Sequence, residues 1–74
     1  MKAVVTIRRR DTIADPEGST IQRALGDLGF AEVRAVRVNR TIELNVDDAA
    51  RVHEMCERLL VNPVIEDFDI EIVT

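Results

Sequence analysis

The alternation of apolar and polar positions along the chain predicts four β-strands. Residues 2–9 are mainly apolar and β-branched, and residues 33–38 repeat that character in the segment VRAVRV. Residues 41–46 and 65–73 alternate, so each would present an apolar side and a polar side. In the last strand the polar side consists of carboxylates, which suits the rim of a contact or an exposed sheet edge.

Between the first two strands, apolar residues recur every three or four positions, which predicts a helix. Asp15 is a good N-cap, and Pro16 suits the first helical position, where an amide N–H has no partner. A capping box of Ser19 and Gln22 would instead start the helix one turn later. Gly29 suits the left-handed residue of a Schellman motif that ends it.

A second helix is predicted after Asp47, its expected N-cap. It would end at Asn62, because the residue before Pro63 is disfavoured in the α conformation. Its inner face would carry five apolar side chains, namely Ala49, Val52, Cys56, Leu59 and Leu60.

The predicted order of elements is βαββαβ, which is the ferredoxin-like arrangement of the α+β class. An antiparallel sheet would carry two helices on one face. Asn39 and Arg40 would form a two-residue hairpin turn, since Asn tolerates the positive φ that such a turn needs. The other face would stay uncovered, and outward apolar residues such as Val4, Ile65 and Val73 predict a contact with another protein there.

The length of 74 residues predicts a single domain spanning 1–74. Such a domain buries only about 60% of its unfolded surface and usually needs disulfides, a metal or oligomerisation. One cysteine excludes an internal disulfide, and one histidine beside it argues against a zinc site. The sequence therefore predicts a homo-oligomer, either a dimer or a tetramer.

Charge and aromatic content argue against nucleic-acid binding. The net charge is −4 and aromatic residues make up 3%, so the chain offers little to phosphates or to unstacked bases. The charge is uneven, because residues 1–40 carry 8 basic and 5 acidic side chains and residues 41–74 carry 2 and 9. Such asymmetry can orient docking onto a protein.

No apolar run approaches the roughly 20 residues of a membrane span, and the N-terminus does not resemble a signal peptide. The single thiol fits a reducing compartment. We therefore expect a cytoplasmic protein without membrane contact.

No group of residues predicts an active site. His53 and Cys56 lie one helical turn apart, but Cys56 would point into the core. The segment ADPEG places Gly18 near a helix N-terminus, yet it lacks the lysine and glycine spacing of nucleotide-binding loops. Gly18 would either admit a close backbone or belong to a loop. We expect no catalytic residue, no metal and no cofactor bound by this chain alone.

Five segments, in chain order, carry a family resemblance: DPEG, ALGDLGF, VRAVRV, IELNVDDA and MCERLLVNPVIEDFDIEI. Together they resemble the PurS family, the small subunit of phosphoribosylformylglycinamidine (FGAM) synthase. LLVNPVIEDF is the most specific part. The family usually has Gly-Lys in the hairpin turn, where this chain has Asn39 and Arg40, so the positive charge is kept.

The resemblance implies a non-catalytic subunit in purine (IMP) biosynthesis. In FGAM synthase, a glutaminase subunit releases ammonia, and a large ATP-dependent synthetase subunit adds it to formylglycinamide ribonucleotide (FGAR). The complex is thus a glutamine-hydrolysing C–N ligase that uses ATP, magnesium and glutamine. The small subunit would bridge the other two as a homodimer or a tetramer.

These considerations give ten candidate interface residues: Asp15, Pro16, Gly18, Arg37, Asn39, Arg40, Asn62, Pro63, Glu66 and Asp67. An ACT-like regulatory domain that binds a small molecule is the alternative, because it shares the topology. Its Asp-x-Pro-Gly-like turn is matched only loosely, since Pro16 and Gly18 are not adjacent.

Overall fold

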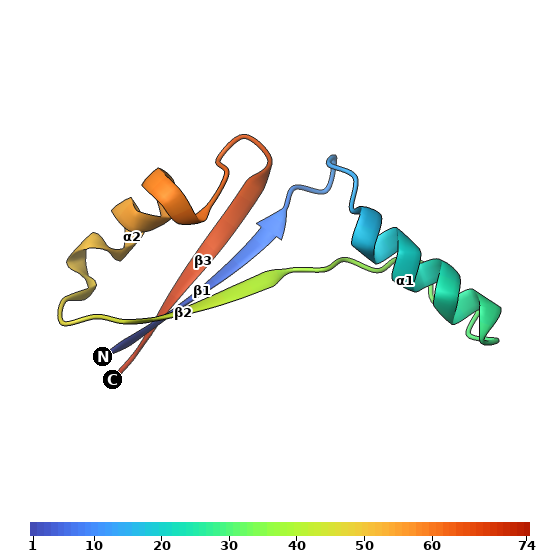
Figure 1. Ribbon diagram of the computed structural model, residues 1–74, viewed down its shortest axis with the longest axis horizontal. Helices are drawn as coiled ribbons and strands as arrows, with labels where there is room; N and C mark the ends of the chain where they lie inside the picture. The colour runs from blue at the N-terminus through green and yellow to red at the C-terminus, as the bar shows by residue number, and fades with distance from the viewer.

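The computed structural model describes residues 1–74 and consists of a small sheet with a long projection (Figure 1). Its principal extents are 47 × 27 × 13 Å. The strands β1 (Lys2–Arg9), β2 (Arg40–Asn45) and β3 (Glu66–Val73) form an antiparallel sheet in the order β2-β1-β3. The helix α1 (Pro16–Asp27) lies beyond the end of this sheet.

β1 is central because its alternate residues are small or β-branched and apolar. Ala3, Val5 and Ile7 are almost completely buried. Val5 lies opposite Ile42 of β2 and Ile70 of β3, so one aliphatic layer runs across all three strands. This layer is the sheet side of the core.

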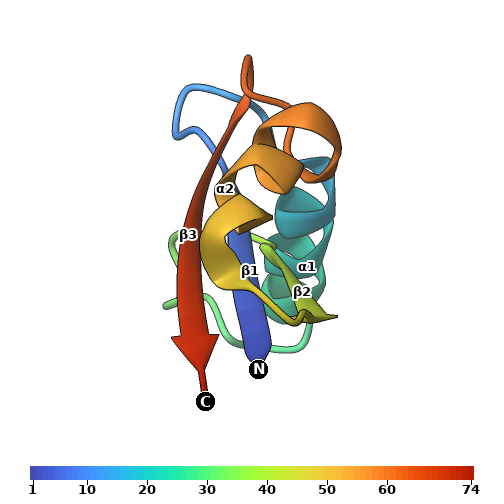
Figure 2. The same cartoon turned by 90° about the vertical axis from the view of Figure 1, so that its left-hand side faces the viewer.

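A short helical segment covers that layer and changes type along its length (Figure 2). It runs through the 3-10 helix η1 (Ala49–Arg51), the α-helix α2 (Val52–Met55) and the π-helix η2 (Cys56–Leu60). The N-cap is Asp48 rather than the expected Asp47, since the Asp48 carboxylate accepts the Ala50 N–H at 2.9 Å.

The π-helix corrects the prediction for the inner face of this segment. Val52 and Cys56 are buried as predicted. A π turn holds more residues than an α turn, so the chain beyond Cys56 is rotated relative to helical spacing. The side chain of Leu59, predicted to be inside, is 83% exposed. Val61 packs in the core instead and is only 5% exposed.

The predicted strand at residues 33–38 is not part of the sheet, and no hairpin turn forms at Asn39 and Arg40. Arg40 is already the first residue of β2, and no residue other than a glycine has positive φ. Figure 1 shows residues 33–39 continuing the line of β2 toward α1. The α+β class is confirmed, with the order β-α-β-α-β, but the fourth strand is absent from this sheet.

The prediction of two helices on one sheet face is also wrong, because only the segment 49–60 covers the sheet. α1 instead lies along the extended residues that follow it. The Gln22 amide donates to the carbonyl oxygens of Val33 at 3.5 Å and Arg34 at 3.0 Å. Residues 16–39 thus form one unit, which we call the arm.

The arm leaves its apolar side chains in solvent. Leu28 is 73% exposed, Phe30 49% and Ile21 39%. Only 8 of the 74 residues are buried, and the one inside the arm is Gly18, so the arm contributes nothing to the core.

The uncovered sheet face is crossed by ion pairs, and the contact with another protein expected there stays a prediction. Arg8 pairs with Asp69 at 2.7 Å, and Lys2 lies 4.0 Å from Glu43. Val4 and Val73 are the apolar residues among these charges.

Candidate assembly interface

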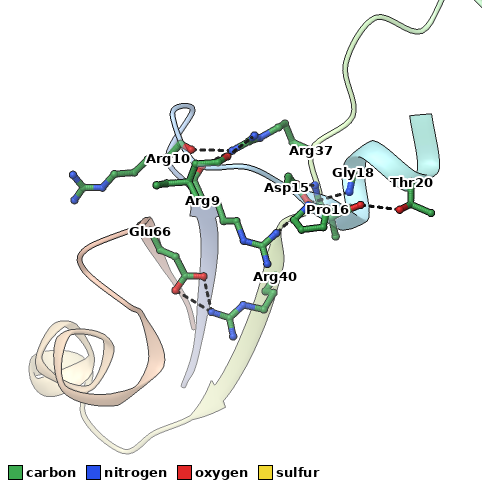
Figure 3. A network of polar contacts seen from close by, with 11 residues as sticks. Arg9, Arg10, Asp15, Pro16, Gly18, Thr20, Arg37, Arg40 and Glu66 are labelled. Carbon is green, nitrogen blue, oxygen red and sulfur yellow. Dashed lines mark hydrogen bonds and ion pairs between the residues drawn. The ribbon is translucent and has the colours of Figure 1, made fainter. Parts of the chain in front are cut away.

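The candidate residues lie around one junction, where the arm leaves the sheet. Figure 3 shows six of them, namely Asp15, Pro16, Gly18, Arg37, Arg40 and Glu66. They form two bonded groups. One surrounds Asp15 at the start of α1, and the other surrounds Glu66 at the start of β3. Asn39 is the last residue of the arm, directly before β2, and its exposed side chain has no recorded hydrogen bond.

Asp15 is the centre of the first group and is only 5% exposed. Its Oδ1 accepts the Gly18 N–H at 2.9 Å and Arg9 Nη1 at 3.0 Å, and its Oδ2 accepts the Val38 N–H at 2.7 Å. These bonds favour the ionised form. The N–H groups of Val38 and Gly18 hold the pKa of Asp15 below its ordinary value, against the opposing effect of burial.

The local sequence explains this geometry. Asp15 is the N-cap and Pro16 is the first helical residue, as predicted, so the alternative start one turn later is not used. The Val36 carbonyl lies so close to Gly18 that a Cβ there would be 2.2 Å from its oxygen. Of the two interpretations of Gly18, close approach of another backbone is therefore confirmed.

Arg37 binds backbone at the same junction. Its Nη1 donates to the Ile13 carbonyl at 3.1 Å, and its Nη2 donates to the carbonyls of Arg9 at 3.2 Å and Arg10 at 3.0 Å. Sequence reasoning gave Arg37 a partner-facing position and did not select Arg9. Strand alternation could have selected it, since residue 9 falls on the same face of the strand as the apolar residues 3, 5 and 7.

Glu66 is the centre of the second group, with a side chain only 11% exposed. Its two carboxylate oxygens accept hydrogen bonds from Arg40 Nη2 at 3.0 and 3.1 Å, and one of them also accepts the Asn62 N–H at 2.8 Å. The Asn62 side chain accepts the Val64 N–H at 3.1 Å. Glu66 therefore closes the turn before β3 and ties that turn to the start of β2.

Arg10 joins this turn to the arm side of the junction. Its Nη2 donates to the Pro63 carbonyl at 2.9 Å, and its Nε lies 3.5 Å from Asp67. Pro63 and Asp67 are both exposed, as are Asn62 and Arg40, so Glu66 is the member of this group that is shielded from solvent.

The bonds of the junction join parts of the chain to one another. Most of its charged groups are paired, Arg37 is bonded to backbone carbonyls, and no three His, Cys, Asp or Glu residues are grouped as metal ligands would be. His53 Nδ1 lies 2.9 Å from Glu57 on the surface. Cys56 is buried, and this burial raises the pKa of its thiol, so its nucleophilic form is disfavoured. None of the helices is both long and apolar enough to cross a bilayer.

Besides the role of Arg9, sequence reasoning missed a groove on the surface. The groove has a volume of about 420 Å³ and lies between β2 and the helical segment. Its apolar wall consists of Leu44, Met55, Leu59 and Leu60, and its charged rim of Arg51, Glu54 and Arg58. The groove exists because the π-helix turns Leu59 outward, which helical periodicity does not predict.

Comparison with known proteins decides the family. The PurS family model, described as phosphoribosylformylglycinamidine (FGAM) synthase, matches residues 2–74. This chain belongs to the PurS family. It is 40% identical to the PurS subunit of Methanocaldococcus jannaschii over 96% of this chain and 93% of that subunit. It is 38% identical to the PurS subunit of Bacillus subtilis over 96% and 90%.

Solved PurS structures agree with the fold described above. B. subtilis PurS matches with a TM-score of 0.89 at 37% identity, covering 99% of this chain and 98% of that one. A chain in the structure of PurLQS from Thermotoga maritima matches with a TM-score of 0.70 at 29% identity, covering 95% and 93%.

The family resemblance predicted from the sequence is thus confirmed, in place of the ACT-like alternative. As a PurS protein, the chain is a subunit of FGAM synthase in purine biosynthesis. This enzyme is ATP- and glutamine-dependent.

Proposed function

We propose that this PurS chain is a non-catalytic bridge that works as a homodimer of arm-exchanged copies. It holds the glutaminase subunit and the large synthetase subunit of FGAM synthase in register, in the cytoplasm, so that ammonia passes to FGAR. The complex uses magnesium with its ATP. The similar chain in T. maritima PurLQS supports assembly with PurL and PurQ.

The observation that carries this proposal is the open arm. β2 is an outer strand, so one edge of it has no hydrogen-bonding partner, and residues 33–38 are extended without sheet pairing. Unpaired strand edges favour pairing with another chain. Residues 33–39 and β2 form one continuous line (Figure 1).

A two-fold axis near Asn39 would use both halves of this line at once. Antiparallel pairing about that axis sets residues 33–38 of each copy beside β2 of the other, since a two-fold contact is reciprocal. Each sheet thereby gains, from its partner, the fourth strand that the sequence pattern predicted.

The groove suits the helix of the same exchanged arm. α1 presents an exposed or half-exposed apolar stripe of Ile21, Leu25 and Leu28. The groove lies on the covered sheet face next to β2, the edge at which the partner's arm would arrive. Burying the stripe there would supply the apolar burial that a chain with 8 buried residues lacks.

Light scattering after gel filtration tests the exchange with a matched pair of variants. Leu59 lies in the groove and is 83% exposed, whereas Val64 lies outside it and is 77% exposed. We expect the wild-type chain and Val64→Glu to be dimers, and Leu59→Glu to be a monomer with unchanged secondary structure by circular dichroism. A monomeric wild type, or a dimeric Leu59→Glu, would contradict the proposal. A wild-type tetramer would add a second interface to the exchanged one.

Co-purification tests the bridge. With glutamine and ADP-magnesium present, wild type and Val64→Glu should co-purify with the PurL and PurQ proteins of the same organism, and Leu59→Glu should not. Binding of monomeric Leu59→Glu at the wild-type level would show that dimerisation is unnecessary. Turnover by the isolated PurS chain would show that it is not a passive bridge.

A further inference from the structure

The arm is bonded to the rest of the chain at its root only. The hydrogen bonds that reach beyond the arm involve Asp15, Arg9 and Arg37, together with the backbone around them. Between the root and the tip, the recorded side-chain bonds stay inside the arm. A few contacts at the root therefore decide the direction of the whole arm. A small rotation of the arm about its root moves the tip further than any other part of the arm.

We propose that Asp15, Arg9 and Arg37 form a latch that fixes the direction of the arm and so selects exchange with a second copy over closure onto the arm's own sheet. This inference rests on the proposed arm exchange. It assigns these residues a positioning role and not a contact with the partner.

The first half of the latch is the Asp15 carboxylate, which joins three pieces of chain. It binds the first turn of α1 through the Gly18 N–H, the returning segment through the Val38 N–H, and the end of β1 through the Arg9 guanidinium. Figure 3 shows Asp15 among these groups, between the end of β1 and the start of α1. Because the carboxylate is 5% exposed, water does not compete freely for these donors.

The second half of the latch is Arg37, which reaches from the arm to the end of the sheet. Its guanidinium donates to three backbone carbonyls, those of Arg9, Arg10 and Ile13. A planar guanidinium with donors at fixed angles holds several acceptors in one orientation, which a flexible lysine does not. Arg37 therefore fixes the position of the returning segment relative to the end of β1.

Together the two halves keep residues 33–39 in line with β2. A straight line offers its edge to another copy, whereas closure onto the same sheet needs a reversal of the chain at Asn39 and Arg40. The tight contact of Gly18 with the Val36 carbonyl adds to this alignment, because helix and returning segment then move as one body. Loosening the latch should let the arm sample other directions, including closure.

Distance measurements between two spin labels test the latch, with labels at Asp27→Cys at the end of α1, off the apolar stripe, and at Val64→Cys on the turn before β3. Both positions are exposed, and the native Cys56 is buried and is replaced by alanine in all samples. Labelled chains are mixed with a large excess of unlabelled chains, so that only distances within one chain are observed.

Two matched pairs of variants separate the latch from general destabilisation. Asp15→Asn is compared with Asp11→Asn, an exposed aspartate of the same loop without a recorded ion pair or hydrogen bond. Arg37→Gln is compared with Arg34→Gln, an exposed arginine of the same extended segment whose side chain has no recorded bond. Circular dichroism and a cooperative melt establish that each variant is folded.

We expect a narrow distance distribution in the background chain and in both controls. Asp15→Asn and Arg37→Gln should broaden this distribution and add shorter distances. The dissociation constant of the dimer should rise about tenfold in each variant, as expected for the loss of one charge-assisted hydrogen bond. Unchanged distributions in folded Asp15→Asn and Arg37→Gln would overturn the latch while leaving arm exchange intact. A wild-type monomer with a narrow distribution would refute arm exchange and, with it, selection by the latch.

Discussion

Gly18 is the most closely confined residue of the arm. An added Cβ would lie 2.2 Å from the Val36 carbonyl oxygen, and a backbone atom cannot rotate away as a side chain can. We expect Gly18→Ala to lower the free energy of unfolding by about 1–3 kcal/mol, the range for overpacked sites. Urea denaturation followed by circular dichroism measures this difference.

Gly26 provides the control within the same helix. A Cβ there would meet nothing within 4 Å, so Gly26→Ala should raise the free energy of unfolding by about 1 kcal/mol through helix propensity alone. Equal effects of the two substitutions would show that the contact of Gly18 with Val36 does not persist in solution.

Asp15 should make stability depend on pH in acid. Hydrogen bonds from the Val38 and Gly18 N–H groups lower the pKa of Asp15 in the folded chain. Its stabilising contribution is therefore complete above the unfolded pKa of about 3.9 and is lost as pH falls through the lower folded pKa. The difference in unfolding free energy between wild type and Asp15→Asn should be constant near neutral pH and shrink in acid. Urea titrations over this range check it, and a difference that grows in acid would contradict the bonding described here.

Several features that depend on local chemistry were predicted correctly, although the cap of the second helix was placed one residue early, at Asp47. β1 covers the predicted residues 2–9, and α1 has the predicted Asp15 cap. Gly29 has a φ of 98°, and the Phe30 N–H bonds to the Leu25 carbonyl at 2.9 Å, so the Schellman motif is confirmed. Each of these features is decided by residues within one turn of the chain.

The elements predicted wrongly depend on partners distant in the sequence. Residues 33–38 have the composition of a strand, but a strand needs a neighbour, and the pattern does not say which chain supplies it. The same holds for the turn expected at Asn39, which exists only if the two flanking strands pair with each other. Leu59 was misplaced for a different reason, since a π turn breaks the 3.6-residue period on which the prediction relied.

The helical segment over the sheet allows a chemical test of its packing. Cys56 is completely buried under Val52 and the sheet, and burial raises the pKa of its thiol. We expect native protein to react slowly with a chromogenic disulfide reagent near neutral pH and to react rapidly once unfolded by urea. Rapid reaction of the folded protein would show that the π-helix opens in solution.

For the molecule as a whole, sequence reasoning chose residues singly and could not show that they meet. Asp15, Arg37 and Glu66 were selected as partner-facing, and each is engaged inside the chain at the junction. The groove was missed altogether, because it depends on the exposed Leu59. Contacts between the ten residues and another subunit stay a prediction.

Arm exchange makes the stability of the molecule depend on protein concentration. A dimer binds its own second copy, so mass action stabilises it as the concentration rises. We expect the melting temperature of wild type to increase over a hundredfold rise in concentration by several degrees, consistent with about 2.7 kcal/mol of linkage. The melting temperature of the Leu59→Glu variant should not change with protein concentration. A melting temperature of wild type that is likewise independent of concentration would argue against exchange. Differential scanning fluorimetry with an external dye measures it, since the chain has no tryptophan.

The separation of the arm from the sheet has a genetic consequence. If each complete half of the dimer takes its sheet from one polypeptide and its arm from the other, a defect in either part harms a different half. A cell that carries one allele damaged at the Leu28 end and another damaged in the groove would then assemble mixed pairs with one intact half and one doubly damaged half. Two alleles that each fail alone should therefore restore growth without purines when expressed together.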